Sequence, residues 1–356
     1  MSIDLPPTAA SLPTPAQAPP VAAADRLPLA SPEAVALRLP HRLRQLLRCP
    51  RCQGPLTAQG GADDPELSCR SPACGQVFPI AEEVPILIDE SRSLFDIATF
   101  LQRDPTFFKQ VGWLRRTVSR CLPDPSANVA APANFAAMRE ILVQQSDRPI
   151  VLVVGGGVVG SGLEAMLDDP RITFLETDAA IGPRTQLICD GHDLPLADAS
   201  VDGVIVQAVL EHVVDPHRCV AEIARVLKPA GLVYSDTPFI QQVHGREFDF
   251  TRFTRLGHRR LFRQFEMLRS GISCGPGMAL AWTLRYFLLS FVQSARARAV
   301  VSGFSRLAFF WLIYLDRFLA HRPAASDAAS AFYFLGRKSD SVLSDRDLIA
   351  DYRGGF

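Results

Sequence analysis

From Ile150 onward, short runs rich in β-branched residues alternate with segments of helical periodicity, and this alternation limits the fold more than any other feature of the chain. The runs predicted to be strands are 150–154, 171–177, 186–189, 202–207 and 231–236. A helix is predicted between the last two, because Asp215-Pro216 is a typical helix start and Lys228-Pro229 ends the helical pattern. Strands that alternate with helices form a mostly parallel sheet. We therefore predict an α/β, Rossmann-like fold whose ligand binds at the carboxyl ends of the strands.

A glycine-rich turn follows the first of these strands, where the sequence runs from VLVV into GGGVVG. Gly155, Gly156 and Gly157 make a tight turn possible and let backbone N–H groups approach a ligand at the start of a helix, as in dinucleotide-binding proteins. Glu176 and Asp178, near the end of the next strand, are candidates for binding ribose hydroxyls. Taken alone, the turn could also be only a strand-to-helix connection, which is the alternative.

Four cysteines stand in two pairs upstream of this region. Cys49-Pro-Arg-Cys52 is followed, after sixteen residues, by Cys69 and then Cys74. A Cys-x-x-Cys turn places two thiolates at metal-binding distance, and a second pair completes a tetrahedron. Four sulfur ligands leave no open position, so the spacing predicts a structural zinc ion in a small domain at residues 36–90. Four unrelated buried thiols are the alternative.

The cysteines belong to a longer motif. The sequence reads CPRCQGPL from Cys49, and LSCRSPACGQVFPIAEEVPILI contains the second pair and an apolar tail. These residues resemble the zinc-ribbon family named after the Trm112 methyltransferase activator, over about 45 residues. The four-residue gap between Cys69 and Cys74 is longer than the two residues usual in that family. The resemblance implies a zinc ribbon of a kind that is often a partner of methyltransferases or fused to them.

A second extended motif lies in the α/β region. DGHDLPLADASVDGVIV begins at Asp190, and it is followed by VLEHVVDP and then by EIARVLKPAG. Together with the glycine turn, these residues resemble the class I S-adenosylmethionine (SAM)-dependent methyltransferases of the broad type 11 group, over about residues 150–240. The resemblance implies a seven-stranded methyltransferase sheet and SAM as the cofactor.

The same resemblance implies a set of cofactor-binding residues. These are Gly155, Gly156, Gly157, Asp178, Asp190, Gly191, Leu210, Glu211 and His212. The glycine turn would lie under the methionine part of SAM, Asp178 would bind the ribose diol, and Asp190 with the backbone of Gly191 would contact adenine. Leu210 and the two residues after it would line the pocket beyond the fourth strand. Val153, where the family usually has an acidic residue, and Val159, where it has a third glycine, depart from the pattern.

The loop after the fifth predicted strand, residues 237–254, should emerge facing the transferred methyl group. His244 has the intrinsic pKa of a general base, and Asp249 would orient it. Arg252 would bind an anionic part of the substrate, and Gln241 is a further candidate substrate contact. The alternative is that His244 is an ordinary hydrogen-bonding loop residue and that Asp249 and Arg252 form a local salt bridge.

Composition and motifs divide the whole chain into segments. We predict a disordered Pro/Ala-rich leader (1–35), the zinc ribbon (36–90), a helical linker (91–146), the core through its sixth strand (147–275), an apolar helical insertion or lid (276–325), the seventh strand (326–340) and a tail (341–356). The insertion leaves the sheet on the ligand side, so it should cover the site. Charged residues such as Arg285 and Asp316 interrupt the apolar segments within 278–320, which argues against a membrane span. Buried helices, an in-plane membrane contact and a wall for a lipid-linked substrate all stay open.

These features together predict an enzyme, a class I SAM-dependent methyltransferase with a structural zinc ion. It would methylate an oxygen or nitrogen atom of a small molecule or of a glycan or lipid precursor. An rRNA or tRNA methyltransferase with a zinc module is one alternative, but 37 basic side chains against 37 acidic ones argue against a nucleic-acid partner. A non-catalytic scaffold with the same fold is the other. The absence of a signal-peptide pattern at the N-terminus predicts a cytoplasmic protein, membrane-associated if the insertion contacts lipid.

Overall fold

The structure is a computed structural model, and it describes residues 36–60, 65–101 and 127–355. The predicted leader at 1–35 and the middle of the predicted linker lie outside these residues. The described parts of the linker contain one helix before that gap, α2 (Ile97–Leu101), and one after it, α4 (Ala131–Gln145).

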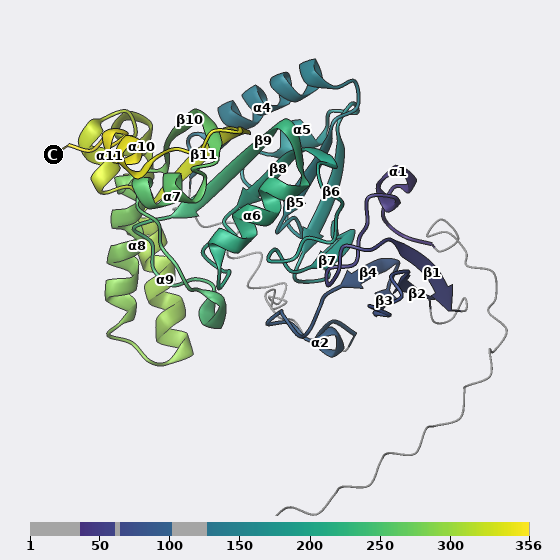
Figure 1. Ribbon diagram of the computed structural model, residues 1–356. Coiled ribbons are helices and arrows are strands. Elements are labelled where there is room, and N and C mark those ends of the chain that lie inside the picture. The colour runs from purple at the N-terminus through teal and green to yellow at the C-terminus, as the bar shows by residue number, and fades with distance from the viewer. Residues whose placement is uncertain (1–35, 61–64, 102–126, 356) are drawn as a thin grey trace, which may run out of the picture.

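One continuous sheet runs through the described part of the chain, with the strand order β1-β2-β3-β4-β7-β6-β5-β8-β9-β11-β10 (Figure 1). Its strands are β1 (Leu56–Gly60), β2 (Pro65–Cys69), β3 (Val77–Ala81), β4 (Val84–Leu87), β5 (Ile150–Val154), β6 (Thr173–Asp178), β7 (Leu187–Cys189), β8 (Val201–Gln207), β9 (Leu227–Pro238), β10 (Phe265–Cys274) and β11 (Ala331–Lys338). The predicted sheet of seven strands is therefore incomplete. The strands from β5 to β11 make up seven, and the N-terminal segment extends the sheet to 11.

The central strands are parallel. β5 pairs in parallel with β6 on one side and β8 on the other, β6 pairs with β7, and β8 pairs with β9. β11 lies antiparallel between β9 and β10, so β10 runs in the same direction as β9. The α/β, Rossmann-like prediction is confirmed, and the carboxyl ends of the parallel strands meet at one edge of the sheet.

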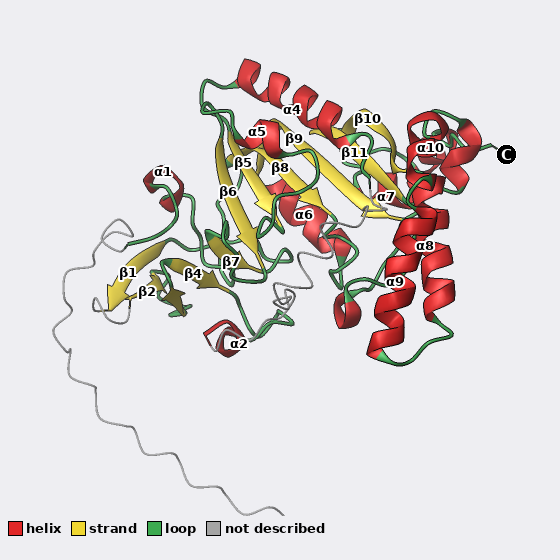
Figure 2. Ribbon diagram, turned by 180° about the vertical axis from the view of Figure 1, so that it is seen from behind, coloured by secondary structure: helices red, strands yellow, loops and turns green. Residues whose placement is uncertain are grey.

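The side chains of β5 alternate between two cores, as expected for a strand buried on both faces. Leu152 and Val154 pack in the core that contains the apolar face of α6 (Pro216–Val226). Val151 and Val153 pack on the opposite face, in the core that contains the apolar side of α4. Figures 1 and 2, seen from opposite sides, show α6 in front of the sheet in one view and α4 with α5 (Glu164–Leu167) in front in the other.

Helix α6 begins as the sequence predicts. The Asp215 side chain accepts a hydrogen bond from Arg218 N at 3.0 Å, and Pro216 occupies the first helical position. The helix ends at Val226, and β9 starts at the next residue, earlier than predicted. The residues 227–230 thus extend the strand, because pairing of Leu227 with Val201 adds hydrogen bonds that a loop would lack.

The N-terminal segment is not a separate domain, which corrects the predicted boundary at residue 90. β4 pairs in parallel with β7, with Ile86 opposite Ile188 and Leu87 opposite Cys189. Buried residues of the segment, including the helix α1 (His41–Arg44), share the core that contains α6. A segment of this size has little core of its own, and joining the edge of the larger sheet buries the apolar side chains that it cannot bury alone.

The predicted insertion forms three helices, α8 (Pro276–Leu289), α9 (Ala295–Phe309) and α10 (Leu312–Leu319), followed by a short 3₁₀ turn at Pro323–Asp327. Asp316 of α10 accepts hydrogen bonds from the backbone N–H groups of Gly277 (2.7 Å) and Met278 (2.9 Å) at the start of α8. A Cβ at Gly277 would lie 2.1 Å from the Leu312 carbonyl oxygen, so glycine is required where α8 and α10 cross. Among the described helices, none is long and apolar enough to cross a membrane alone. The helices α9 and α10, which meet at a bend of 45°, together have the length and apolar composition of a membrane span.

Two short helices remain, α7 (Arg255–Leu261) after the loop that follows β9 and α11 (Asp345–Ala350) after β11. They contact each other at the end of the sheet where β10 and β11 lie. A 3₁₀ turn at Arg246–Phe248 lies within the loop itself. The loop therefore runs from the end of β9 across the carboxyl edge of the sheet before α7 returns the chain to the core.

Candidate functional site

The structure brings the four predicted cysteine ligands together. The Cys49 and Cys74 sulfur atoms are 3.7 Å apart, and those of Cys52 and Cys69 are 3.4 Å apart. Ligands about 2.3 Å from a tetrahedral zinc ion lie about 3.8 Å from one another, so these two separations are close to those of such a site, and all four sulfur atoms lie within 4.8 Å of one another. Burial raises the pKa of the Cys69 thiol to about 11. Metal binding here must displace that proton, which makes the affinity depend on pH.

The glycine turn is fixed to the end of the neighbouring strand. Gly156 N donates to the Thr177 carbonyl at 2.8 Å, and Gly157 N donates to Oδ2 of Asp178 at 2.7 Å. Gly155 has a positive φ of 74°, and a Cβ there would lie 2.5 Å from a methyl carbon of Val209. The turn thus depends on glycine for both its backbone conformation and its close packing.

The helix expected directly after the glycine turn is absent. Turns occupy the residues from Gly155 to Leu163, and α5 begins only at Glu164 and is four residues long. The predicted ligand site at a helix N-terminus is therefore wrong for this chain. The polar groups near a ligand here come instead from the turn itself and from the end of β6.

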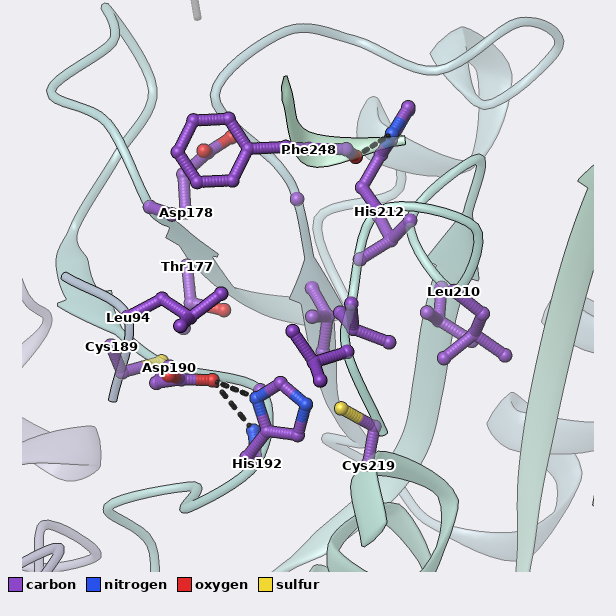
Figure 3. A pocket seen from close by; sticks show the side chains of 18 of the residues that line it. Leu94, Thr177, Asp178, Cys189, Asp190, His192, Leu210, His212, Cys219 and Phe248 are labelled. Atoms are coloured by element: carbon purple, nitrogen blue, oxygen red, sulfur yellow. Dashed lines mark hydrogen bonds and ion pairs between the residues drawn. The ribbon is translucent and has the colours of Figure 1, made fainter. Parts of the chain in front are cut away.

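A cavity of about 310 Å³ opens at the carboxyl ends of the parallel strands (Figure 3). Of the predicted cofactor residues, those that line it are Gly155, Asp178, Asp190, Gly191, Leu210 and His212. Gly156 and Gly157 form the turn behind its wall, and Glu211 is buried beneath it. The volume lies within the usual range of about 300–1,000 Å³ for small-molecule sites. The predicted residues from four different loops therefore converge on one pocket.

Asp178 stands at the end of β6 and contacts this cavity. Burial raises the pKa of its carboxyl group, and hydrogen bonds from Gly157, Ala179 and Ala180 N–H groups oppose that rise. The N–H groups hold the carboxylate at a fixed position. Its remaining lone pairs can accept hydrogen bonds from a ligand.

Asp190 belongs to a hydrogen-bonded group at another side of the cavity. It accepts hydrogen bonds from Nδ1 of His192 at 2.6 Å and from the Ser93 hydroxyl at 2.6 Å (Figure 3 shows the first). Burial alone would raise the pKa of the Asp190 carboxyl group, but the hydrogen bonds from His192 and Ser93 have the larger combined effect, and the net pKa is lowered. His192 in turn accepts a hydrogen bond at Nε2 from Asp215 N at 3.1 Å. This group links the α6 N-terminus to the segment that follows the cysteine cluster.

Several pocket residues were missed by the sequence analysis. Leu94 and Phe95 line the cavity, and the Phe95 ring stacks on Phe248 with centroids 5.8 Å apart. Leu94 and Phe95 read in the sequence as part of a helix face, although α2 begins only at Ile97. The contact of Phe95 with Phe248 links segments about 150 residues apart, so no local pattern in the sequence could have indicated it.

The insertion does not cover the cavity, which corrects the predicted lid. None of the described residues that line the cavity comes from 276–325. Instead, α8 packs outside the loop that follows β9. Gln242 donates to the Thr283 hydroxyl at 3.0 Å, and the Tyr286 hydroxyl donates to the Val243 carbonyl at 3.3 Å. The loop lies between the insertion and the cavity, so α8 supports the cavity's rim without forming it.

The substrate contact predicted for Arg252 is not available, because its side chain is used within the loop. Arg252 donates to Asp249 and to the backbone carbonyls of Gln241, Gln242 and Thr251, which together occupy all five of its N–H groups. No donor is left for a substrate anion. Asp249 accepts hydrogen bonds from the backbone of His244 (2.7 Å) and Gly245 (3.0 Å), so it holds the loop, and its Oδ2 also lies 3.6 Å from Nδ1 of the His244 ring. The alternative, a local salt bridge, is the arrangement found.

Gln241 lies away from the cavity. Its side chain and that of Arg252 line a separate open hollow together with Tyr286 of α8. Hydrogen bonds from Arg252 to the Gln241 and Gln242 carbonyls thus connect the two ends of this loop. One side of the loop lines the main cavity and the other lines the separate hollow.

His244 lines the cavity, with the buried carboxylate of Glu211 beside its ring. Its Nε2 is 3.6 Å from Oε1 of Glu211, and the pKa of His244 is raised, chiefly by this carboxylate and against the effect of burial. His212 lies beside His244 with ring centroids 4.9 Å apart, and its Nδ1 is 2.7 Å from the Phe248 carbonyl oxygen (Figure 3).

Comparison with known proteins identifies the region around this cavity. Residues 167–235 match the family model described as "Methyltransferase domain". An uncharacterised methyltransferase of Mycobacterium tuberculosis is 41% identical over 75 residues, which are 21% of this chain and 30% of the relative. A second, from Mycobacterium sp. (strain KMS), is 36% identical over 113 residues, 29% of this chain and 44% of the relative. The chain thus spans less than half the length of these curated relatives.

Solved structures of similar fold include the [4+2]-cyclase SpnF and a phosphoethanolamine N-methyltransferase of Haemonchus contortus in complex with SAM. The first has a TM-score of 0.35 and 16% identity and covers 61% of this chain and 85% of its own. The second has a TM-score of 0.37 and 14% identity and covers 60% and 54%. The family model and the sequence relatives support the prediction of a class I SAM-dependent methyltransferase made from the motifs.

Proposed function

We propose that this chain transfers a methyl group from SAM to an oxygen or nitrogen atom of a small molecule or of a glycan or lipid precursor. The observation that carries the proposal is the cavity at the carboxyl ends of the strands. There the Asp178 carboxylate accepts a hydrogen bond from Gly157 N, and the Asp190 carboxylate accepts hydrogen bonds from Ser93 and His192. Two fixed carboxylates in a largely apolar pocket suit a ligand with a sugar diol and an amino-substituted ring.

The residues present fit SAM. Asp178 offers lone pairs for the two ribose hydroxyls, and Asp190 with the backbone of Gly191 offers acceptor and donor groups for the adenine edge. The absence of a Cβ at Gly155 keeps the backbone of the turn close to Val209, which leaves the space above it for the methionine part. When bound, SAM supplies an electrophilic methyl group. The protein's contribution is to hold the acceptor in line with it and to exclude water.

The acceptor would enter beside His212, His244 and Phe248, which lie on the loop side of the cavity. Asp249 and Arg252 fix that loop through backbone contacts, so its shape is set before a ligand binds. A pre-formed wall lowers the entropic cost of aligning the acceptor.

Calorimetric titration of the full chain with SAM tests the proposal. We expect one binding site with a Kd in the micromolar range, and transfer of radiolabel from methyl-labelled SAM to hydroxyl or amine acceptors of the right class. S-adenosylhomocysteine should compete. A folded chain that binds neither compound would instead be a non-catalytic scaffold.

We also propose that the cysteine cluster binds a structural zinc ion, since four thiols at tetrahedral spacing with no open position fit that metal. The ion would hold β1, β2 and the turns on either side of them, and through β4 it would support the edge of the main sheet.

A further part of the proposal is that the insertion contacts a membrane surface, which suits a lipid-linked acceptor. The side chains exposed by more than half on α8, α9, α10 and their connections include Phe287, Phe291, Val300, Phe304, Trp311 and Phe318. Residues 276–322 contain six arginines but one acidic residue, Asp316, which is 0% exposed. An apolar surface with arginines and no exposed acid is typical of contact with anionic lipid.

Binding to lipid vesicles tests whether the insertion contacts a membrane surface. Sedimentation with phosphatidylglycerol vesicles should pellet the chain, whereas phosphatidylcholine vesicles should pellet at least several-fold less. Glutamate at both Phe291 and Phe304 should abolish the binding, and the matched change Val342→Glu, at a residue exposed elsewhere on the molecule, should leave it intact. Equal sedimentation of all three proteins would exclude the membrane contact.

A further inference from the structure

Three side chains with metal-binding atoms meet beside the cavity, and the function described above does not use them together. They are Glu211, His212 and His244, whose ligand atoms all lie within 4.8 Å of one another. The Nε2 atoms of His244 and His212 are 3.6 Å and 3.8 Å from Oε1 of Glu211. The two histidines come from different loops, one after β8 and the other after β9.

Glu211 is the unusual member of this cluster. Its residue is 0% exposed, and neither carboxylate oxygen has a hydrogen-bond partner among the described residues. A buried carboxylate without hydrogen bonds is strongly unfavourable unless a cation balances its charge. No Lys or Arg ion pair is formed with Glu211 in the part of the chain that the structure describes, so only the two imidazole rings face it.

The hydrogen bonds of the rings show which nitrogen atoms can bind a cation. Nδ1 of His212 is 2.7 Å from the Phe248 carbonyl oxygen, and Nδ1 of His244 is 3.3 Å from the Gln242 carbonyl oxygen. A carbonyl oxygen only accepts, so both Nδ1 atoms donate and, in the neutral rings, both Nε2 atoms carry lone pairs. Both Nε2 atoms lie within 3.8 Å of the same carboxylate oxygen, Oε1 of Glu211. Histidines that ligate metals are commonly oriented by such a hydrogen bond from the other ring nitrogen.

We propose that Glu211, His212 and His244 bind one divalent first-row transition-metal cation, such as Mn²⁺ or Zn²⁺, at the acceptor side of the cavity. Ligands about 2.1 Å from a tetrahedral centre lie about 3.4 Å apart, so edges of 3.6 and 3.8 Å need only a small contraction. Two imidazoles and one carboxylate suit such metals and leave coordination positions open. Because both histidines line the cavity and Glu211 lies beneath, the open positions face the space for the acceptor.

The role of the cation rests on the proposed function. A hydroxyl oxygen of the acceptor would coordinate to the cation, which lowers the pKa of that hydroxyl so that its proton passes to water. The oxygen atom then becomes the stronger nucleophile. This narrows the acceptor to a hydroxyl compound, and it gives His244 the role of a metal ligand in place of the general base that the sequence suggested.

Metal titration without SAM tests the site. The full chain, with its cysteine cluster loaded with zinc, is titrated with Mn²⁺ while electron paramagnetic resonance measures the free ion, and with Zn²⁺ in a calorimeter. We expect one additional site per chain. Glu211→Gln, which keeps the volume of the side chain, should weaken binding at least tenfold, and His244→Gln should do the same. His217→Ala, at an exposed histidine on α6, is the matched control and should bind as the wild type does.

The outcomes separate the two proposals. If neither cation binds beyond the cysteine cluster, or if both variants, shown by circular dichroism to be folded, bind it unchanged, the metal site is excluded. SAM binding is measured on the same samples. If the chain binds the cation but not SAM, the metal site is supported and the methyltransferase proposal is excluded. If the chain binds SAM but no cation, the methyltransferase proposal is supported and the metal site is excluded.

Discussion

Replacing Asp178 with alanine is expected to weaken SAM binding by at least about 100-fold, with a parallel loss of methyl transfer. The carboxylate faces the cavity and fixes Gly157 N at 2.7 Å, so the change removes a ligand contact and loosens the glycine turn at once. Hydrogen bonds to a charged group contribute about 1.5–3 kcal/mol each, and two ribose hydroxyls would lose such bonds. A loss of about 3 kcal/mol corresponds to a factor above 100 in Kd.

Two further variants separate the two effects. Asp178→Asn keeps an oxygen that can accept from Gly157 N but lacks the charge, so it should retain more affinity than the alanine variant and less than the wild type. Asp168→Ala, at an exposed residue just after α5, should bind SAM normally. Calorimetry on the three proteins measures this, and wild-type affinity in Asp178→Ala would show that SAM does not bind in this cavity.

Serine at both Cys49 and Cys69 is expected to remove one equivalent of zinc per chain and to unfold the segment between residues 36 and 90. Structural zinc contributes roughly 10–16 kcal/mol in zinc-finger peptides, which exceeds what a core of this size can supply. Because β4 pairs with β7, the loss should also expose that edge of the main sheet. Metal analysis and limited proteolysis report the two effects directly.

The cysteine variants should also affect the cofactor site. Ser93 donates to Asp190, and Phe95 stacks on Phe248, so both contacts depend on a chain segment that begins directly after the cysteine domain. We expect SAM affinity to fall several-fold. Cys274→Ser, at a buried cysteine outside the cluster, is the matched control for placing serine in a core, and it should keep its zinc. Unchanged zinc content in the double variant would remove the ribbon proposal.

The elements that local sequence specifies were predicted well. The alternating apolar residues of β5, the cap of α6 at Asp215 and the spacing of the four cysteines each act over a few residues, so a single sequence contains the information. The same holds for Asp178, because a carboxylate at the end of a strand next to a glycine turn is a local arrangement within a parallel sheet.

The features that depend on contacts between distant segments were not predicted. The number of donors that Arg252 has already used can be counted only when the loop is folded, and the stacking of Phe95 on Phe248 joins separate segments. The pairing of β4 with β7 likewise follows from the geometry of the whole sheet. Sequence motifs therefore located the pocket residues on and after β6 and β7, whereas the wall formed by Phe95 and Phe248 came from nonlocal packing.

The pairing of β4 with β7 has a consequence for how this chain can be divided. β7 has only three residues, and without β4 its outer backbone groups would be left unpaired, as a template for association with other chains. A fragment cut before β5 would also lack Ser93 and Phe95 from its pocket. We therefore expect the smallest unit that folds alone to begin upstream of the cysteines, and fragments trimmed to the family-matched region to aggregate.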